Sequence, residues 1–142
     1  MGEFEGKTAV ITGASRGIGR GIATHLGSLG ANIVATARNN AALDSLVAEL
    51  GNAGTRALAI TADLSSEEDI QSIASGALAE FGRVDILVNN GAIIHPRLHL
   101  VDFDVALWKE VIAVNLVAAA ILTRAVLPSM IENRYGKVIN IS

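Results

Sequence analysis

The chain contains no cysteine, which excludes disulfide bonds, thiolate metal sites and a cysteine nucleophile. Its 142 residues include only two prolines, one tryptophan, one tyrosine and three phenylalanines. The 11 basic side chains are outnumbered by 14 acidic ones, and the net charge of −3 argues against a nucleic-acid-binding protein. The first residues lack the basic and apolar stretches of a secretory signal. We therefore expect a cytoplasmic protein.

Long apolar runs are also few. The most apolar stretch, residues 111–122, has roughly a dozen residues and contains Asn115, so it indicates a buried helix and no membrane span. Apolar residues nevertheless make up 51% of the chain, enough to bury a substantial core. We expect one domain over residues 1–142.

Short runs of β-branched residues alternate with segments of helical periodicity. This alternation predicts an α/β fold, a doubly wound parallel sheet with helices on both faces, as in Rossmann-like domains. Ser65 and Glu68 have the spacing of a capping box at the start of the third helix, and Gly82 suits its end. The five predicted strands lie near residues 7–12, 31–36, 57–62, 84–89 and 137–141.

A fourth predicted helix, residues 104–127, carries apolar residues on two stripes. A helix that is apolar on most of its circumference is buried on two sides, and only one side can face its own sheet. We therefore expect this helix to contact another helix or another subunit, as in a homo-oligomer. The stripes are Leu107, Val111, Val114, Ala118, Ile121 and Ala125, and Trp108, Ile112, Leu116, Ala119 and Val126.

The segment from Thr12 to Gly19 is the most informative motif. It follows an apolar strand and opens a helix, the context of a turn that binds the pyrophosphate of a dinucleotide at a helix N-terminus. Gly13 permits a tight turn, Gly17 allows close approach of backbone N–H groups, and Gly19 allows the helix to pack closely. A glycine turn without a ligand is the alternative. The predicted binding residues are Gly13, Ser15, Arg16, Gly17, Ile18 and Gly19.

Four further motifs follow predicted strands or lie in the fourth helix: Ala37-Arg38, Asp63-Leu64, Asn89-Asn90-Gly91-Ala92 and Val114-Asn115-Leu116. Together with the glycine turn, in this order and spacing, they resemble the short-chain dehydrogenase/reductase family. The 3-oxoacyl-carrier-protein reductases and small sugar or polyol dehydrogenases look most similar. The resemblance implies the strand order 3-2-1-4-5 and hydride transfer between a nicotinamide cofactor and a carbonyl or alcohol substrate.

The resemblance also bears on the choice of cofactor. Family members that use NAD usually carry an acidic residue where this chain has Ala37. Without that carboxylate, Arg38 and Arg16 could pair with the 2′-phosphate of NADP(H), which we expect to be preferred, with NAD(H) as the alternative. An Arg38 that is merely a solvated charge at a helix start is the other interpretation.

The resemblance implies that Asp63 and Leu64 bind the adenine. Asp63 would also suit the start of a helix. The resemblance assigns the adenosine ribose to the turn Asn89, Asn90, Gly91 and Ala92, whose last two residues are swapped relative to the family pattern. A left-handed conformation at Ala92 would then be strained.

Asn115 is the active-site asparagine by the same resemblance, holding a water that links the catalytic lysine to solvent. A satisfied amide of the core is the alternative, because a buried amide requires hydrogen-bond partners. His95 and His99 flank Pro96 in a loop near the expected substrate mouth, and this arrangement predicts no metal site.

Family members use a serine, a tyrosine and a lysine that follow the fifth strand. Ser142 aligns with the first of two adjacent serines, of which the second is usually catalytic, and Tyr135 precedes the strand without a lysine four residues later. We therefore expect the cofactor-binding portion of such an enzyme, truncated after the fifth strand. A non-catalytic dinucleotide-binding module and a self-associating fragment are the alternatives.

Overall fold

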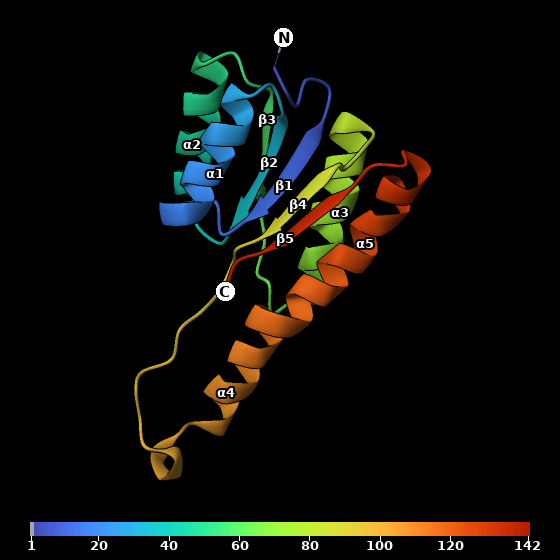
Figure 1. The fold of residues 1–142 in the computed structure, drawn as a ribbon. Coiled ribbons are helices and arrows are strands. Elements are labelled where there is room, and N and C mark those ends of the chain that lie inside the picture. The colour runs from blue at the N-terminus through green and yellow to red at the C-terminus, as the bar shows by residue number, and fades with distance from the viewer. Residues whose placement is uncertain (1) are drawn as a thin grey trace.

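Five parallel strands form one sheet in the computed structural model, which describes residues 2–142 (Figure 1). The strand order is β3-β2-β1-β4-β5, so the predicted order is confirmed. The central strand pairs through Val10 with Val34 of β2 and Leu87 of β4. The strands are β1 (Thr8–Thr12), β2 (Asn32–Ala37), β3 (Ala57–Thr61), β4 (Ile86–Asn89) and β5 (Lys137–Asn140), each within two residues of its predicted bounds.

Helices cover both faces of the sheet, two on each side (Figure 1). One face carries α1 (Gly17–Ser28) and α2 (Asn40–Asn52), and the other carries α3 (Glu67–Phe81) and α5 (Ala118–Glu132). A short 3₁₀ turn (Leu100–Asp102), α4 (Val105–Ile112) and a π-helical segment (Ala113–Val117) precede α5.

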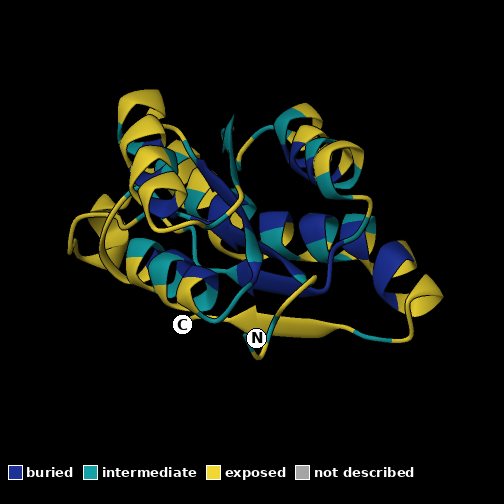
Figure 2. Ribbon diagram, turned by 90° about the horizontal axis from the view of Figure 1, so that it is seen from above, coloured by how far each residue is buried: buried dark blue, intermediate teal, exposed yellow. Residues whose placement is uncertain are grey.

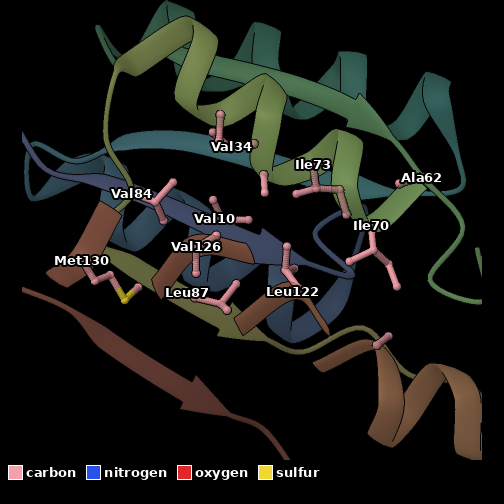
Figure 3. Packing of buried hydrophobic residues seen from close by; sticks show 13 residues of the cluster. Val10, Val34, Ala62, Ile70, Ile73, Val84, Leu87, Leu122, Val126 and Met130 are labelled. Carbon is pink, nitrogen blue, oxygen red and sulfur yellow. The ribbon is translucent and has the colours of Figure 1, made fainter. Parts of the chain in front are cut away.

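The strands alternate between two hydrophobic cores, as the period of two along a strand requires. Val10 of β1 points to the core under α3 and α5, whereas its neighbours Ala9 and Ile11 point to the core under α1 and α2. Figure 3 shows the first of these cores, in which Leu122 and Val126 meet Leu87 and Ile73. Because both faces are buried, the central strands are continuous apolar runs.

Helix α3 begins one residue later than the predicted capping box. Ser66, not Ser65, is the N-cap, and its hydroxyl accepts the N–H of Asp69 at 3.2 Å. The predicted Ser65–Glu68 pair is wrong because Asp63 accepts both the backbone N–H and the hydroxyl of Ser65. The helix ends at Gly82 with a φ of 73°, so the predicted left-handed end is confirmed.

The predicted fourth helix is longer than expected. Residues 105–132 are helical throughout, with the π-helical turn in the middle and Pro128 inside α5. The helix continues past Pro128 because the next turn is held by tertiary contacts. Ser129 is buried, and its hydroxyl accepts the N–H of Val84 at 3.0 Å.

Within this chain the long helix is buried on one side, and the predicted contact of its other side with another helix or another subunit stays a prediction. One stripe is buried, formed by Val114, Ala118, Leu122, Val126 and Met130. The other side is open to solvent, with Trp108 at 48% and Leu116 at 63% of full exposure. No residue of α4 is buried, because α4 extends beyond the sheet (Figure 1).

The helix is also longer than the apolar stretch of residues 111–122 from which a membrane span was judged too short. Residues 105–132 form a 28-residue helix that is long and apolar enough to cross a bilayer by length and composition. Its α5 half, however, packs on α3 and the sheet through Leu122 and Val126. Packing of this kind is typical of a core helix, so the length gives little support for membrane insertion.

The edge strand β5 is exposed along its whole length, as Figure 2 shows. Its carboxyl end lies beside that of β4, with the N–H of Ile141 donating to the carbonyl of Asn89 at 3.0 Å. The carboxyl ends of all five strands therefore lie at one edge of the sheet, where open parallel sheets bind their ligands.

Candidate functional site

The glycine turn connects β1 to α1 at this edge. Gly13 and Gly17 have left-handed φ values of 63° and 57°, which glycine adopts without strain. The N–H of Ala14 donates to the carbonyl of Thr36 at 3.1 Å and ties the turn to β2. Arg16 precedes α1 without capping it through its side chain, and the first turn contains no acidic residue. The N-terminus of α1 is therefore suited to an anion.

The close packing predicted for Gly19 is present. A Cβ atom at Gly19 would lie 2.2 Å from the carbonyl oxygen of Gly13 and 2.6 Å from Nδ2 of Asn90. A Cβ atom at Gly13 would lie 2.9 Å from the same Nδ2 and from Cα of Gly91. The turn, the start of α1 and the end of β4 thus approach each other more closely than any side chain permits. A Cβ atom at Gly17, in contrast, would have no atom within 4 Å, which leaves the start of α1 open to a ligand such as a dinucleotide pyrophosphate.

Thr12 joins these segments, and sequence reasoning missed its role. Its hydroxyl accepts the N–H groups of Asn90 at 2.9 Å and Gly91 at 2.7 Å, and it lies near the carbonyl of Val88 at 3.4 Å. The available signal was a polar residue ending an otherwise apolar strand. Thr12 is 2% exposed, so its hydroxyl needs partners within the protein.

Asn89, the last residue of β4, and Asn90 tie neighbouring strands, as the resemblance implied. Asn90 Nδ2 donates to the carbonyl of Thr12 at 3.1 Å. Asn89 Nδ2 donates to Asn140 Oδ1 at 2.9 Å and to Thr123 Oγ1 at 3.3 Å, linking β4 to β5 and α5. Ala92 does not have a positive φ, so the expected strain from the swapped Gly-Ala order is absent.

Arg16 and Arg38 are both exposed and follow neighbouring strands, β1 and β2. Neither makes an ion pair within residues 2–142. Arg38 does not itself open α2. The N-cap is Asn39, whose side chain accepts the N–H of Ala42 at 3.0 Å. Both guanidinium groups are thus available to an anionic ligand.

Asp63 follows β3, and one of its carboxylate oxygens is engaged. Its Oδ1 accepts the backbone N–H of Ser65 at 2.9 Å and the hydroxyl of Ser65 at 2.7 Å. These hydrogen bonds hold the pKa of Asp63 below its usual value, burial opposes the shift, and the positive charge of Arg38 adds to it. The helix-start role of Asp63 is therefore present, and Asp63 carries a negative charge at neutral pH.

Leu64 lies against the turn after β4. A Cβ atom at Gly91 would lie 2.6 Å from Leu64 Cδ1 and 3.2 Å from Thr12 Oγ1. The structure thus brings the motifs after β1, β3 and β4 together at one place. The predicted cofactor residues lie at this edge as a group, although their contacts with a nucleotide stay a prediction.

Asn115 lies in the π-helical segment and forms two hydrogen bonds with the loop after β4. Its Oδ1 accepts the N–H of Ile93 at 2.9 Å, and its Nδ2 donates to the carbonyl of Ile93 at 2.9 Å. The amide has the expected partners, but the residue is exposed, so the premise that it is buried is wrong here. The π-helical turn coincides with Asn115, a common association at functional sites.

The loop of residues 93–104 extends away from the sheet together with α4 (Figure 1). Trp108 contacts it, with ring centroids 5.5 Å from Phe103 and 6.4 Å from His95. A cavity of about 140 Å³ lies between this loop and α4, lined mainly by apolar side chains. The glycine turn is not among the residues that line this cavity, and the position of the loop near a substrate mouth stays a prediction.

Tyr135 lies at the opposite edge of the sheet, just before β5 begins. The ammonium group of Lys7 lies 4.1 Å from the centre of its ring. Ser142, in contrast, follows β5 at the edge that carries the candidate site. The structure thus separates the only tyrosine of the sequence from the glycine turn by the length of a strand.

Several known proteins are similar in sequence to almost the whole of this chain. The family model for the short chain dehydrogenases matches residues 7–142. A 3-oxoacyl-acyl-carrier-protein reductase of Escherichia coli is 39% identical over 97% of this chain, which covers 55% of the reductase. Other curated relatives are matched over 46% to 58% of their lengths, so the chain spans about half the length of the curated relatives it matches.

Two solved structures have the same fold. A metagenomic short-chain oxidoreductase in complex with NADP has a TM-score of 0.94 at 45% identity, over 98% of this chain and 63% of that protein. A 7α-hydroxysteroid dehydrogenase in complex with NADH and a 7-oxo bile acid has a TM-score of 0.93 at 33% identity, over 98% of this chain and 54% of that protein.

Proposed function

Because the chain belongs to the short-chain dehydrogenase family, we propose that it is the cofactor-binding part of an oxidoreductase that uses NADP(H) and a small carbonyl or alcohol substrate. The nicotinamide ring, when bound, supplies or accepts the hydride. The observation that carries the proposal is the meeting of the bare glycine turn, Leu64 and Gly91 at the carboxyl edge of the sheet.

In the proposal, different residues at this edge of the sheet bind different parts of the nucleotide. Backbone N–H groups at the start of α1 bind the pyrophosphate, and the turn from Asn89 to Ala92 borders the adenosine ribose. Asp63 and Leu64 bind the adenine, through the free carboxylate oxygen and the apolar side chain. Asn115 holds the loop after β4 and orders water near the reacting end.

The preference for NADP(H) over NAD(H) is proposed from charge. Ala37 places no carboxylate beside the ribose, and the exposed Arg16 and Arg38 have no protein partner within the described residues. A charge-assisted hydrogen bond contributes about 1.5–3 kcal/mol, so one arginine could favour the phosphorylated cofactor roughly tenfold to a hundredfold. A cytoplasmic location, which the lack of cysteine favours, belongs to the same proposal.

The test is titration of the purified chain with NADPH and with NADH in matched low-salt buffer, followed by nicotinamide fluorescence. Tighter binding of NADPH, weakened by Arg38→Ala with NADH binding unchanged, supports the proposal. Equal affinities refute the preference. Binding of neither nucleotide refutes cofactor binding by these residues alone.

Turnover is a separate question, because Tyr135 lies far from the glycine turn. We propose that these 142 residues bind nucleotide without sustained catalysis, as a positioned general acid is worth about 10² to 10⁴ in rate. Steady oxidation of NADPH with a panel of ketones would contradict this.

Self-association through the long helix is proposed as a second property. The apolar residues Trp108, Ile112 and Leu116 lie on successive turns and are 48%, 39% and 63% exposed. Size-exclusion chromatography with light scattering tests this. An oligomer that Leu116→Glu dissociates supports the proposal, and a monomer at every concentration refutes it.

A further inference from the structure

Arg20 of α1 makes an unusual set of contacts outside the motifs described above. Its Nη1 donates to the carbonyl oxygens of Ser15 at 3.4 Å and Ala42 at 3.3 Å. Its Nη2 donates to Ser45 Oγ at 3.4 Å and to Glu49 Oε2 at 2.6 Å. One guanidinium group thus connects the glycine turn with α2, and Glu49 is its shortest contact.

The two carbonyl groups that Arg20 contacts lie beside the proposed phosphate-binding arginines. Ser15 immediately precedes Arg16 in the glycine turn. Ala42 belongs to the first turn of α2, where its N–H is capped by Asn39, the residue after Arg38. Arg16 is therefore bonded directly to a residue whose carbonyl Arg20 contacts. Arg38 is connected to the other carbonyl through Asn39 and its hydrogen bond to Ala42.

The three arginines Arg16, Arg20 and Arg38 differ in whether a carboxylate balances their charge. Arg16 and Arg38 have no ion-pair partner in the described chain, whereas the charge of Arg20 is balanced by Glu49. The Arg20 side chain is also only 27% exposed. It is thus poorly placed to bind a phosphate itself and well placed to hold two backbone segments together.

We propose that Arg20, anchored by Glu49, is a positioning residue that sets the separation of Arg16 and Arg38 for the 2′-phosphate of NADP(H). The role depends on the proposed cofactor preference. The planar guanidinium suits it because it donates several hydrogen bonds in a fixed arrangement, which a lysine cannot reproduce.

The proposal predicts a loss of selectivity between nucleotides. In the proposal both Arg16 and Arg38 contact the 2′-phosphate, a group that NADH lacks. Freeing the glycine turn from α2 should therefore weaken NADPH binding more than NADH binding. Loss of the Arg20–Glu49 pair should lower the ratio of the two affinities about two- to fivefold, the range of exposed ion pairs.

Glu49→Gln is the decisive variant because two explanations predict opposite signs. If Arg20 acts only through its charge, removal of the Glu49 carboxylate makes the site more positive and strengthens NADPH binding. If Arg20 acts as a tether, the same change weakens NADPH binding relative to NADH. Arg20→Lys, which keeps the charge, should also lower the selectivity.

Arg56→Ala is the matched control. Arg56 forms an ion pair with Glu80 at 3.4 Å, elsewhere on the same protein, and its loss should leave the affinity ratio unchanged. Amide hydrogen exchange of the nucleotide-free chain supplies a second measurement that needs no cofactor. Exchange in residues 14–17 should be faster in Glu49→Gln than in the wild type.

The outcomes are distinguishable. Equal affinities of the wild type for NADPH and NADH overturn the cofactor preference, and the selectivity role with it, whatever the exchange data show. A wild-type preference that Glu49→Gln leaves unchanged or increases overturns the role of Arg20 alone. A lower ratio in both Glu49→Gln and Arg20→Lys, with faster exchange and an unchanged Arg56→Ala, supports it.

Discussion

Two threonines on the same face of β1 provide a direct test of how the site is held. Thr8 and Thr12 are 0% and 2% exposed, and both are replaced by valine with almost no change in shape. The hydroxyl of Thr12 accepts two N–H groups, from Asn90 and Gly91. The hydroxyl of Thr8 has no hydrogen-bond partner among the described residues. The same substitution should therefore have opposite effects.

The magnitudes follow from the hydrogen bonds. A buried donor that loses its acceptor costs about 1–3 kcal/mol. In Thr12→Val the N–H of Gly91 loses its acceptor, whereas the N–H of Asn90 keeps the carbonyl of Val88 at 3.1 Å, so the free energy of unfolding should fall by about 1–3 kcal/mol. Thr8→Val removes a buried hydroxyl without a partner, and stability should be unchanged or rise by up to about 1 kcal/mol.

Urea unfolding followed by circular dichroism measures both variants. The midpoint should shift down for Thr12→Val and not for Thr8→Val, with similar slopes in denaturant. Thr36→Val, at a second unpartnered buried hydroxyl, should behave like Thr8→Val. Equal destabilisation by Thr8→Val and Thr12→Val would refute the reasoning, since hydroxyl hydrogen bonding would then not distinguish the two sites.

Three further outcomes concern the nucleotide-free chain. Ser65→Ala should raise the depressed pKa of Asp63 in an NMR titration, and the stabilisation linked to Asp63, present above about pH 4, should vanish as pH falls through the folded-state pKa. Ser129→Ala leaves the buried N–H of Val84 without its acceptor and should cost about 1–3 kcal/mol in urea unfolding. Leu122→Ala, at 1% exposure, should cost about 2–5 kcal/mol in the same assay, and a loss below about 1 kcal/mol would contradict its place in the core.

The sequence allowed the order of elements to be predicted because the relevant signals are local. Short apolar strands, helical periodicity and Gly82 are all visible within a few residues, and they placed each strand within two residues of its position. The strand order came from the resemblance to a family. The motifs at the strand ends then gathered at one edge, since parallel strands bring their carboxyl ends together.

Contacts between distant residues were not predictable in the same way. Thr12 contacts Asn90 across 78 residues, and Arg20 contacts Glu49 across 29, with no local pattern to indicate either. The N-cap of α3 was misplaced by one residue because two adjacent serines both suit a helix start. Only the three-dimensional structure shows that Asp63 engages the first of them.

The long helix shows a different limit. The buried stripe combines Val114 and Ala118 of one predicted stripe with Val126 of the other, because a hydrophobic pattern does not say what a face contacts. Leu122 and Val126 face the core, whereas Trp108 and Leu116 face solvent in this chain. The pattern therefore does not show which faces are covered within the chain where the helix extends past the sheet.

The pairing of β1 with β4 also constrains how the protein matures during synthesis. The glycine turn leaves the ribosome early, but the residues that close over it, Asn90 and Gly91, are made almost 80 positions later. Closure of such a long loop must wait for the intervening chain and lowers the folding rate. An emerging chain shorter than about 90 residues would thus contain the glycine turn but lack Asn90 and Gly91, which hold it to β4. The proposed cofactor site is therefore completed late in synthesis.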